Sequence, residues 1–352
     1  MDRIFVCIVF LTATTLFAAT PGVVVITPLG SHAGDFCRND RALLFEDPTG
    51  VRVLWDPGRT IAGETDERLG EIHVLVLSSV HSDHIGEVKK NPAAPGTCAA
   101  PGTVTAAPNS NAAAIAAAKN SVVFTGGEMS DFLGRKMQNI RGSATPACPA
   151  NGLASEVTVP RTEPCTATLR PGGSRTVRLS GASAAVKFAV VPAFHSNGIP
   201  AALVDSPSVA AGTTAYGGND GGAILQFTNG LSVYLTADSG MFGDMDAIVR
   251  RYYKPSVVVI NMGDTATMGP DEAAFAVREL IKPRTVIPEH GNEAATTSGN
   301  VNSGTRLERF IQLVRASRPD TTWVSRAISP PIDVVLPLSD AKIRCDGDGR
   351  CQ

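Results

Sequence analysis

The segment 77–86 reads LSSVHSDHIG and places His81, Asp83 and His84 on one short turn after an apolar run. All three side chains are natural metal ligands, and nitrogen and oxygen donors so close together suit two neighbouring metal ions. The chain has 6 histidines among 352 residues, so this turn uses two members of a small set. The turn therefore predicts a metal site if the rest of the chain supplies further ligands.

Three later positions could supply the missing ligands, because each follows an apolar, strand-like run. They are His195, Asp238 and His290. Rigid strands aim the residues that their edge loops carry, so strand ends are where α/β proteins build sites. Taken singly, each histidine could be an ordinary polar loop residue. Taken together with the turn at His81, they predict one cluster.

Short strands and helices must position these residues. Apolar and β-branched runs predict strands at 22–27, 42–45, 51–55, 74–77, 176–179, 186–191, 223–227, 231–236, 256–260 and 285–287. Helices are predicted at 110–118, 128–141, 245–253, 271–280 and 306–316. In each half of the chain strands come first and helices later, which is compatible with two facing sheets covered by helices.

The motifs and their order resemble the metallo-β-lactamase superfamily, in a metal-dependent hydrolase branch similar to ascorbate-6-phosphate lactonase. The matching motifs are LGSH at 29–32, SSVHSDH at 78–84, FH at 194–195, ADSG at 237–240, TMGP at 267–270 and IPEH at 287–290. The match runs from about residue 23 to about residue 300. It implies an α/β fold, the αββα sandwich of two facing mixed sheets with helices outside.

The resemblance also implies a ligand set for two metal ions. Position by position, it gives the first site His81 and His195, the second site Asp83, His84 and His290, and makes Asp238 the bridge between them. The implied cofactor is zinc, as one or two ions, with manganese as a further possibility. A shared hydroxide would attack a carbonyl or phosphoryl centre. Asp83 and Asp238 are therefore expected in catalysis, and His32 is expected to contact substrate or a metal-bound water.

Ser79 departs from the family pattern, because it stands where the family turn has its first histidine. A serine hydroxyl is a poor zinc ligand, whereas the second site keeps a full tetrahedral set. Three outcomes remain open. One metal could bind at the second site and still support hydrolysis, two could bind with the first held weakly, or metal could bind without efficient catalysis.

The expected function is that of an exported metal-dependent hydrolase of a small ester, lactone or phosphodiester. Two alternatives are a β-lactamase and a metal-binding protein with a degenerate first site and little catalysis. Specificity in such folds depends on loops, so the motifs do not fix the substrate. The 31 basic and 33 acidic residues nearly balance, which argues against a nucleic-acid partner. The sequence does not indicate an oligomeric state.

The N-terminus predicts export. Residues 1–20 place Arg3 before an apolar run and end in small residues, as in a signal peptide, so no stable membrane anchor is expected after cleavage. The 6 cysteines beyond this segment suit the oxidising periplasm or a secreted protein. Fifteen pairings are possible. Proximity favours the pairs Cys345–Cys351 and Cys148–Cys165, which leaves Cys37 with Cys98.

The remaining chain divides into two parts. Residues 21–338 are expected to form the hydrolase domain, with 142–172 as a disulfide-stapled insertion. Residues 339–352 are expected to form a polar tail that carries the Cys345–Cys351 loop.

Overall fold

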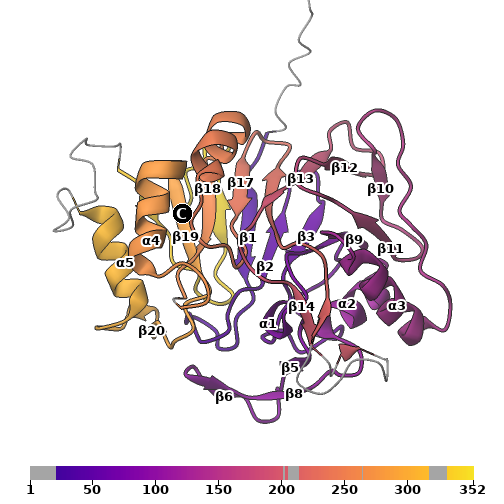
Figure 1. The fold of residues 1–352 in the computed structure, drawn as a ribbon, viewed down its shortest axis with the longest axis horizontal. Coiled ribbons are helices and arrows are strands. Elements are labelled where there is room, and N and C mark those ends of the chain that lie inside the picture. The colour runs from indigo at the N-terminus through magenta and orange to yellow at the C-terminus, as the bar shows by residue number, and fades with distance from the viewer. Residues whose placement is uncertain (1–20, 201–202, 205–213, 264, 317–330) are drawn as a thin grey trace, which may run out of the picture.

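The computed structural model describes residues 21–200, 203–204, 214–263, 265–316 and 331–352 (Figure 1). The predicted signal peptide, residues 1–20, lies outside the described residues. The helices are α1 (Ser82–Ile85), α2 (Asn111–Lys119), α3 (Met129–Arg141), the π-type helix η2 (Met245–Tyr253), α4 (Pro270–Phe275), its π-type continuation η3 (Ala276–Ile281) and α5 (Arg306–Arg315).

Two large sheets form the centre of the molecule. The first has the order β11-β9-β4-β3-β2-β1-β23 and contains β1 (Val24–Pro28), β2 (Leu43–Glu46), β3 (Arg52–Trp55), β4 (Val74–Leu77), β9 (Val122–Thr125), β11 (Cys165–Thr168) and β23 (Ile343–Cys345). The second has the order β10-β12-β13-β16-β17-β18-β19-β22 and contains β10 (Val157–Val159), β12 (Ser174–Leu179), β13 (Val186–Pro192), β16 (Gly221–Gln226), β17 (Ser232–Leu235), β18 (Val257–Asn261), β19 (Thr285–Glu289) and β22 (Asp333–Val334). Both are mixed: β3 pairs with β4 in parallel but with β2 antiparallel, and β17 pairs with β18 in parallel but with β16 antiparallel.

Among the described residues, four two-stranded pairs lie outside the large sheets. They are β5 (Val88–Lys90) with β8 (Thr103–Thr105), β6 (Gly96–Thr97) with β7 (Ala100–Pro101), β14 (Gly198–Pro200) with β15 (Thr214–Tyr216), and β20 (Thr296–Thr297) with β21 (Asn300–Val301).

The alternation of side chains along the strands explains the layers. Val74 of β4 and Val257 of β18 belong to one buried cluster between the sheets. Their neighbours point outward, Leu75 to the cluster beneath α2 and α3, and Val258 to the cluster beneath η2, α4, η3 and α5. Strands buried on both faces require a covering layer on each side. The predicted αββα sandwich is therefore confirmed, and Figure 1 shows α2 and α3 on the opposite side of the strands from α4 and α5.

Residues 142–172 are integrated into the sandwich. The Cys148–Cys165 disulfide staples this segment, as expected. Its strand β11 extends the first sheet by pairing with β9, and its strand β10 forms the edge of the second sheet by pairing with β12. The segment thus contributes an edge strand to each sheet as well as the surface loops between them.

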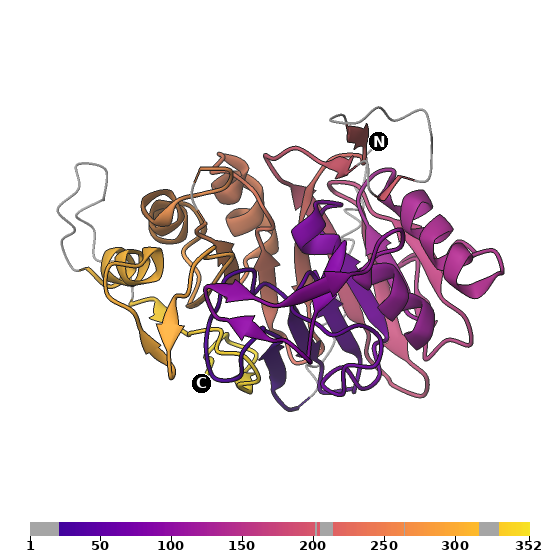
Figure 2. The ribbon, with the colours of Figure 1, turned by 90° about the horizontal axis from the view of Figure 1, so that it is seen from below.

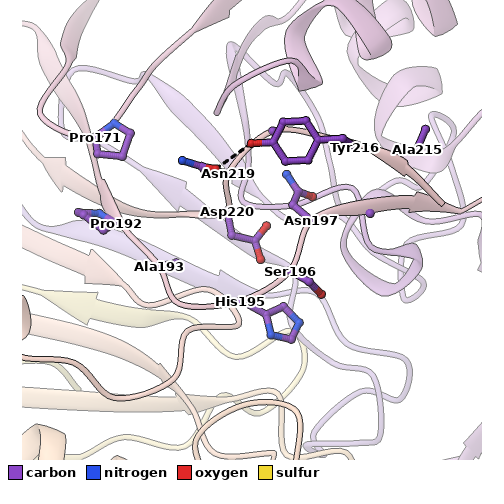
Figure 3. Close-up of a pocket in the computed structure, with 12 residues that line it drawn as sticks. Pro171, Pro192, Ala193, His195, Ser196, Asn197, Ala215, Tyr216, Asn219 and Asp220 are labelled. Atoms are coloured by element: carbon purple, nitrogen blue, oxygen red, sulfur yellow. Dashed lines mark hydrogen bonds between the residues drawn. The ribbon is translucent and has the colours of Figure 1, made fainter.

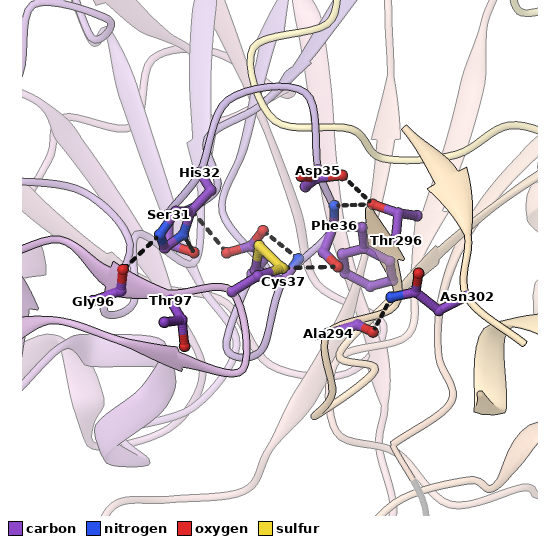
Figure 4. The surroundings of a disulfide bond; sticks show 12 residues. Ser31, His32, Asp35, Phe36, Cys37, Gly96, Thr97, Ala294, Thr296 and Asn302 are labelled. Carbon is purple, nitrogen blue, oxygen red and sulfur yellow. Dashed lines mark hydrogen bonds between the residues drawn. A yellow bond between two sulfur atoms is a disulfide. The ribbon is translucent and has the colours of Figure 1, made fainter. Parts of the chain in front are cut away.

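The predicted disulfide pairing is confirmed, with Cys37–Cys98 and Cys345–Cys351 as the other two bonds. The Cys37–Cys98 bond joins the loop after β1 to the β6–β7 hairpin (Figure 4). The Thr296 hydroxyl donates to Asp35 Oδ1 at 2.9 Å and accepts the Phe36 N–H at 2.8 Å, which ties the same loop to the segment after β19. In the part of the chain that the structure describes, no helix has the length and apolar character needed to cross a membrane.

Candidate metal centre

Four of the predicted ligands, Asp83, His84, Asp238 and His290, form one group with potential ligand atoms within 4.8 Å of one another. His84 Nε2 lies 2.8 Å from Asp238 Oδ2, and His290 Nε2 lies 3.0 Å from Asp238 Oδ1. These residues follow β4, β17 and β19, so two sheets contribute to the group. This is the set expected for the second site.

The other two predicted ligands, His81 and His195, form a second group whose third member is Asp220. Their rings meet edge to face, with centroids 4.9 Å apart. Asp238 Oδ2 lies 3.8 Å from His81 Nδ1 and 3.8 Å from His195 Nε2, so Asp238 stands between the two groups. The structure thus brings together all six predicted metal ligands and adds Asp220, which the motifs did not single out.

Asp56 orients the imidazole of His84. Its Oδ2 lies 2.8 Å from His84 Nδ1, and its Oδ1 accepts the Ser78 N–H at 2.9 Å. A ring nitrogen paired with a carboxylate carries the proton, which leaves the opposite nitrogen free to bind a metal. Asp56 therefore directs His84 Nε2 toward Asp238.

Asn261, at the end of β18, holds the Asp238 loop from behind. Its Nδ2 donates to the carbonyls of Ala237 at 2.5 Å and Ser239 at 3.0 Å, on either side of Asp238. The turn requires a positive φ of 56° at Ala237. An isolated Asn at a strand end gives no sequence signal for this role, which depends on the parallel pairing of β17 and β18.

Ser79 takes no part in either group. It is fully buried, and its Oγ accepts the His81 N–H at 3.0 Å. The hydroxyl thus stabilises the turn that carries His81.

His32 also lies outside both groups. Its Nδ1 lies 3.0 Å from Ser31 Oγ and its Nε2 lies 3.4 Å from the Gly96 carbonyl, beside the Cys37–Cys98 bond (Figure 4). A contact of His32 with substrate stays a prediction.

Arg41 is a component that the motifs did not predict. Its guanidinium is buried, with Nη1 2.5 Å from Asp83 Oδ2 and 2.8 Å from His84 Nε2. A permanent positive charge therefore stands at the edge of the second group. In the sequence Arg41 follows Asp40 directly before an apolar run, and its partners Asp83 and His84 lie more than forty positions later.

The donor chemistry of the second group fits a metal ion. Asp238 Oδ1 and His290 Nε2 are both buried and form an ion pair at 3.0 Å, but neither atom has a hydrogen bond among the residues that the structure describes. Buried polar atoms in proteins are almost always paired, and a cation between these two would satisfy both. In the metal-free protein burial raises the pKa of Asp238, but the positive charges of the protonated His84 and His290 outweigh it and hold the pKa well below its usual range. The carboxylate is thus ionised, as a ligand must be.

A pocket of about 560 Å³ opens beside the first group (Figure 3). His195 and Asp220 form part of its wall, together with Asn197 and Tyr216. Tyr216 is exposed, and its hydroxyl donates to Asn219 Oδ1 at 2.8 Å. The pocket gives a small molecule access to the cluster from this side.

No family model matches the chain. Over 258 residues it is 30% identical to a protein of Cupriavidus taiwanensis named as a UPF0173 metal-dependent hydrolase, and the match covers 72% of each chain. The chain belongs to this family. A UPF0173 metal-dependent hydrolase of Koribacter versatilis is 25% identical over 282 residues, which cover 78% of this chain and 91% of that protein.

Among solved structures, the metallo hydrolase Igni18 of Ignicoccus hospitalis superposes with a TM-score of 0.53 at 17% identity, covering 92% of this chain and 99% of Igni18. This likeness concerns the fold. The protein is a metal-dependent hydrolase with the metallo-β-lactamase fold, as the motifs predicted. The finer resemblance to ascorbate-6-phosphate lactonase stays a prediction.

Proposed function

We propose that this UPF0173 protein is exported and hydrolyses a small ester, lactone or phosphodiester with water activated at the Asp238 centre. The observation that carries the proposal is the position of Asp238, whose carboxylate lies within 3.8 Å of imidazole nitrogens of both ligand groups, next to a pocket that His195 lines. One carboxylate shared by two groups of imidazole and carboxylate ligands suits a pair of neighbouring metal ions. Bound zinc or manganese would lower the pKa of a coordinated water and polarise the scissile group.

The chain's own residues account for the rest of the site. Asp56 fixes the orientation of His84, and Asn261 fixes the loop of Asp238, so both ligands are held before substrate arrives. Such fixed geometry avoids reorganisation during the reaction. Arg41 adds a positive charge near Asp83, which would favour a developing negative charge on the substrate.

Export is supported by the three disulfides, which persist in oxidising compartments and are rare in the cytosol. Expression of the full chain followed by fractionation and N-terminal sequencing tests this part. Recovery of a mature chain without its first residues, in the periplasm or medium, is expected. A full-length chain confined to the cytosol would contradict export.

The catalytic part is tested with EDTA-stripped protein reloaded with zinc or manganese. It is assayed on p-nitrophenyl acetate, a γ-lactone and bis(p-nitrophenyl) phosphate, with a penicillin and a carbapenem in parallel. Metal-dependent turnover of one of the first three is expected, and Asp238→Ala should lower it at least about 100-fold. Asp348→Ala, which removes a carboxylate from the exposed tail, is the matched control.

Three results would contradict the proposal. Turnover confined to the two β-lactams would favour the β-lactamase alternative. Metal binding with no turnover on any substrate would favour a degenerate site, and a reloaded protein without metal would remove the basis of the proposal.

A further inference from the structure

The first ligand group lacks the histidine that the family turn provides. Ser79 occupies that position, and its hydroxyl is engaged with the His81 N–H at 3.0 Å. Two imidazoles, His81 and His195, remain, with Asp238 Oδ2 3.8 Å from a nitrogen of each. A tightly held metal ion normally has at least three protein ligands, so this group needs one more.

Asp220 has the properties of the missing ligand. A carboxylate oxygen lies within 4.8 Å of ligand nitrogens of His81 and His195. Asp220 is 2% exposed, and neither of its carboxylate oxygens has a hydrogen-bond partner among the described residues. A buried carboxylate without partners is costly, since it loses its hydration and gains nothing in return. A cation among Asp220, His81 and His195 would supply the missing interaction.

The loop that carries Asp220 is built against the turn that carries His81. Asn197 joins them: its Oδ1 accepts the Val80 N–H at 2.8 Å, and its Nδ2 donates to the Gly217 carbonyl at 3.1 Å. Gly217 allows this approach, because a Cβ there would lie 2.5 Å from Val80 Cγ2. His195 is two positions before Asn197, so one buried amide holds the segments of all three residues. Figure 3 shows the Asp220 carboxylate on the side of the pocket where His195 lies.

We propose that Asp220 is the third protein ligand of the first metal site and replaces the histidine lost at Ser79. The first site then has two imidazole nitrogens, the Asp220 carboxylate and a share of Asp238, so two metal ions bind per chain. A set of two histidines and carboxylates is harder than a set of three histidines, so it accepts manganese or ferrous iron more readily. The inference rests on the proposed function only in requiring that the protein binds metal.

The test compares metal content and affinity in Asp220→Asn, Asp220→Ala and the unaltered protein. Each is stripped with EDTA, reloaded with zinc and passed through a desalting column, and zinc per chain is measured by mass spectrometry. Site affinities come from competition with a chromophoric chelator. Glu128→Gln is the charge-matched control, because this exposed carboxylate lies beside Gly218 of the same loop. His290→Ala reports on the second group.

Two zinc ions are expected in the unaltered protein and in Glu128→Gln, and one in both Asp220 variants. The first-site affinity should fall at least about 100-fold, since even outer partners of a ligand change affinity 10–100-fold. His290→Ala should keep the first-site ion. If the unaltered protein holds a single zinc ion, the inference requires that Asp220→Asn lowers the affinity for that ion.

Unchanged stoichiometry and affinities in Asp220→Asn would overturn the inference and leave the proposed function intact. The inference would also be overturned if the protein holds a single zinc ion that is lost in His290→Ala but kept in Asp220→Asn, and the proposed function would again stand. An unaltered protein that binds no zinc would overturn both. The Asn substitution keeps the shape of the side chain, and circular dichroism of each variant separates loss of a ligand from loss of the fold.

Discussion

Arg41 Nη1 lies 2.5 Å from Asp83 Oδ2 and thereby places a guanidinium at the edge of the second ligand group. The same nitrogen is 2.8 Å from His84 Nε2, the atom that Asp56 directs toward the centre. A guanidinium and a metal ion are both cations and compete for the same carboxylate and the same ring nitrogen. Arg41 therefore stabilises the metal-free protein and lowers the affinity of the second site.

Replacing Arg41 should change the stability of the metal-free protein and the metal affinity of the second site in opposite directions. We expect Arg41→Met to destabilise the metal-free protein by about 3 kcal/mol, because it leaves Asp83 without its buried partner. It should also raise the second-site affinity for zinc at least about tenfold, since the competing charge is gone. Urea unfolding in EDTA measures the first effect, and chelator competition measures the second.

Arg59→Met is the matched control for Arg41→Met. Arg59 forms an ion pair with Glu87 and donates to Ser82 Oγ at 2.6 Å, close to the same turn but outside both ligand groups. It should leave zinc affinity unchanged. A second-site affinity that falls in Arg41→Met would show that the guanidinium supports the metal instead of competing with it.

Asp56→Asn should weaken metal binding without removing a ligand. The amide keeps the shape of the carboxylate but loses the charge that holds the proton on His84 Nδ1, and such partners typically change affinity about 10–100-fold. The zinc affinity of the second site measures the effect. Asp47→Asn is the control: Asp47 is also buried and accepts the Thr228 N–H at 2.8 Å, but belongs to neither ligand group. Equal zinc affinities in the two variants would contradict the positioning role of Asp56.

The layers of the fold could be predicted from the sequence because the apolar runs are strong. The run at 74–77 coincides with β4, and Pro270 is the first residue of α4, as its fixed φ favours. Strand β9 was not predicted from the sequence, because Val122–Thr125 is a short apolar run that begins three positions after the end of α2. An apolar run so close to the C-terminal end of α2 at Lys119 can belong to the end of that helix as well as to a separate strand.

The ligands in motifs could also be predicted, whereas Asp220 and Arg41 could not. Asp220 lies in the run GGND, which is typical of a solvated turn. Its loop lies close against the turn of His81, since a Cβ at Gly217 would lie 2.5 Å from Val80 Cγ2, although the two residues are more than 130 positions apart. Arg41 likewise gains its role from Asp83 on a different strand end. Local patterns carry no information about such contacts.

The disulfides should differ in what they contribute to stability. In the chain-entropy account a cross-link stabilises more when it closes a longer loop. The separations are 61 residues for Cys37–Cys98 and 6 for Cys345–Cys351. Replacing both cysteines by serine should therefore cost about 4 kcal/mol for the first pair and about 2 kcal/mol for the second. Urea unfolding of both variants checks the order, and an equal or reversed order would contradict it.

Asp40 should make stability depend on pH. Its carboxylate is buried and accepts the N–H groups of Ser31 at 2.9 Å and Cys37 at 2.8 Å, and burial raises its pKa to about 7. The pKa of an unfolded Asp is about 3.9, so between these values the folded chain binds more protons than the unfolded chain. The contribution of Asp40 to the free energy of unfolding is therefore complete below pH ~4, falls as pH rises toward ~7, and is level above that.

Asp40→Asn removes this titration and so isolates it. The difference in unfolding free energy, wild type minus Asp40→Asn, should fall by up to about 1.4 kcal/mol per pH unit between pH ~5 and ~7. Urea unfolding of the EDTA-treated, disulfide-intact proteins at a series of pH values measures it. Groups other than Asp40 cancel in the difference, since they titrate in both proteins. A difference that stays constant, or rises with pH, would mean that the two backbone N–H groups hold Asp40 ionised in the folded chain.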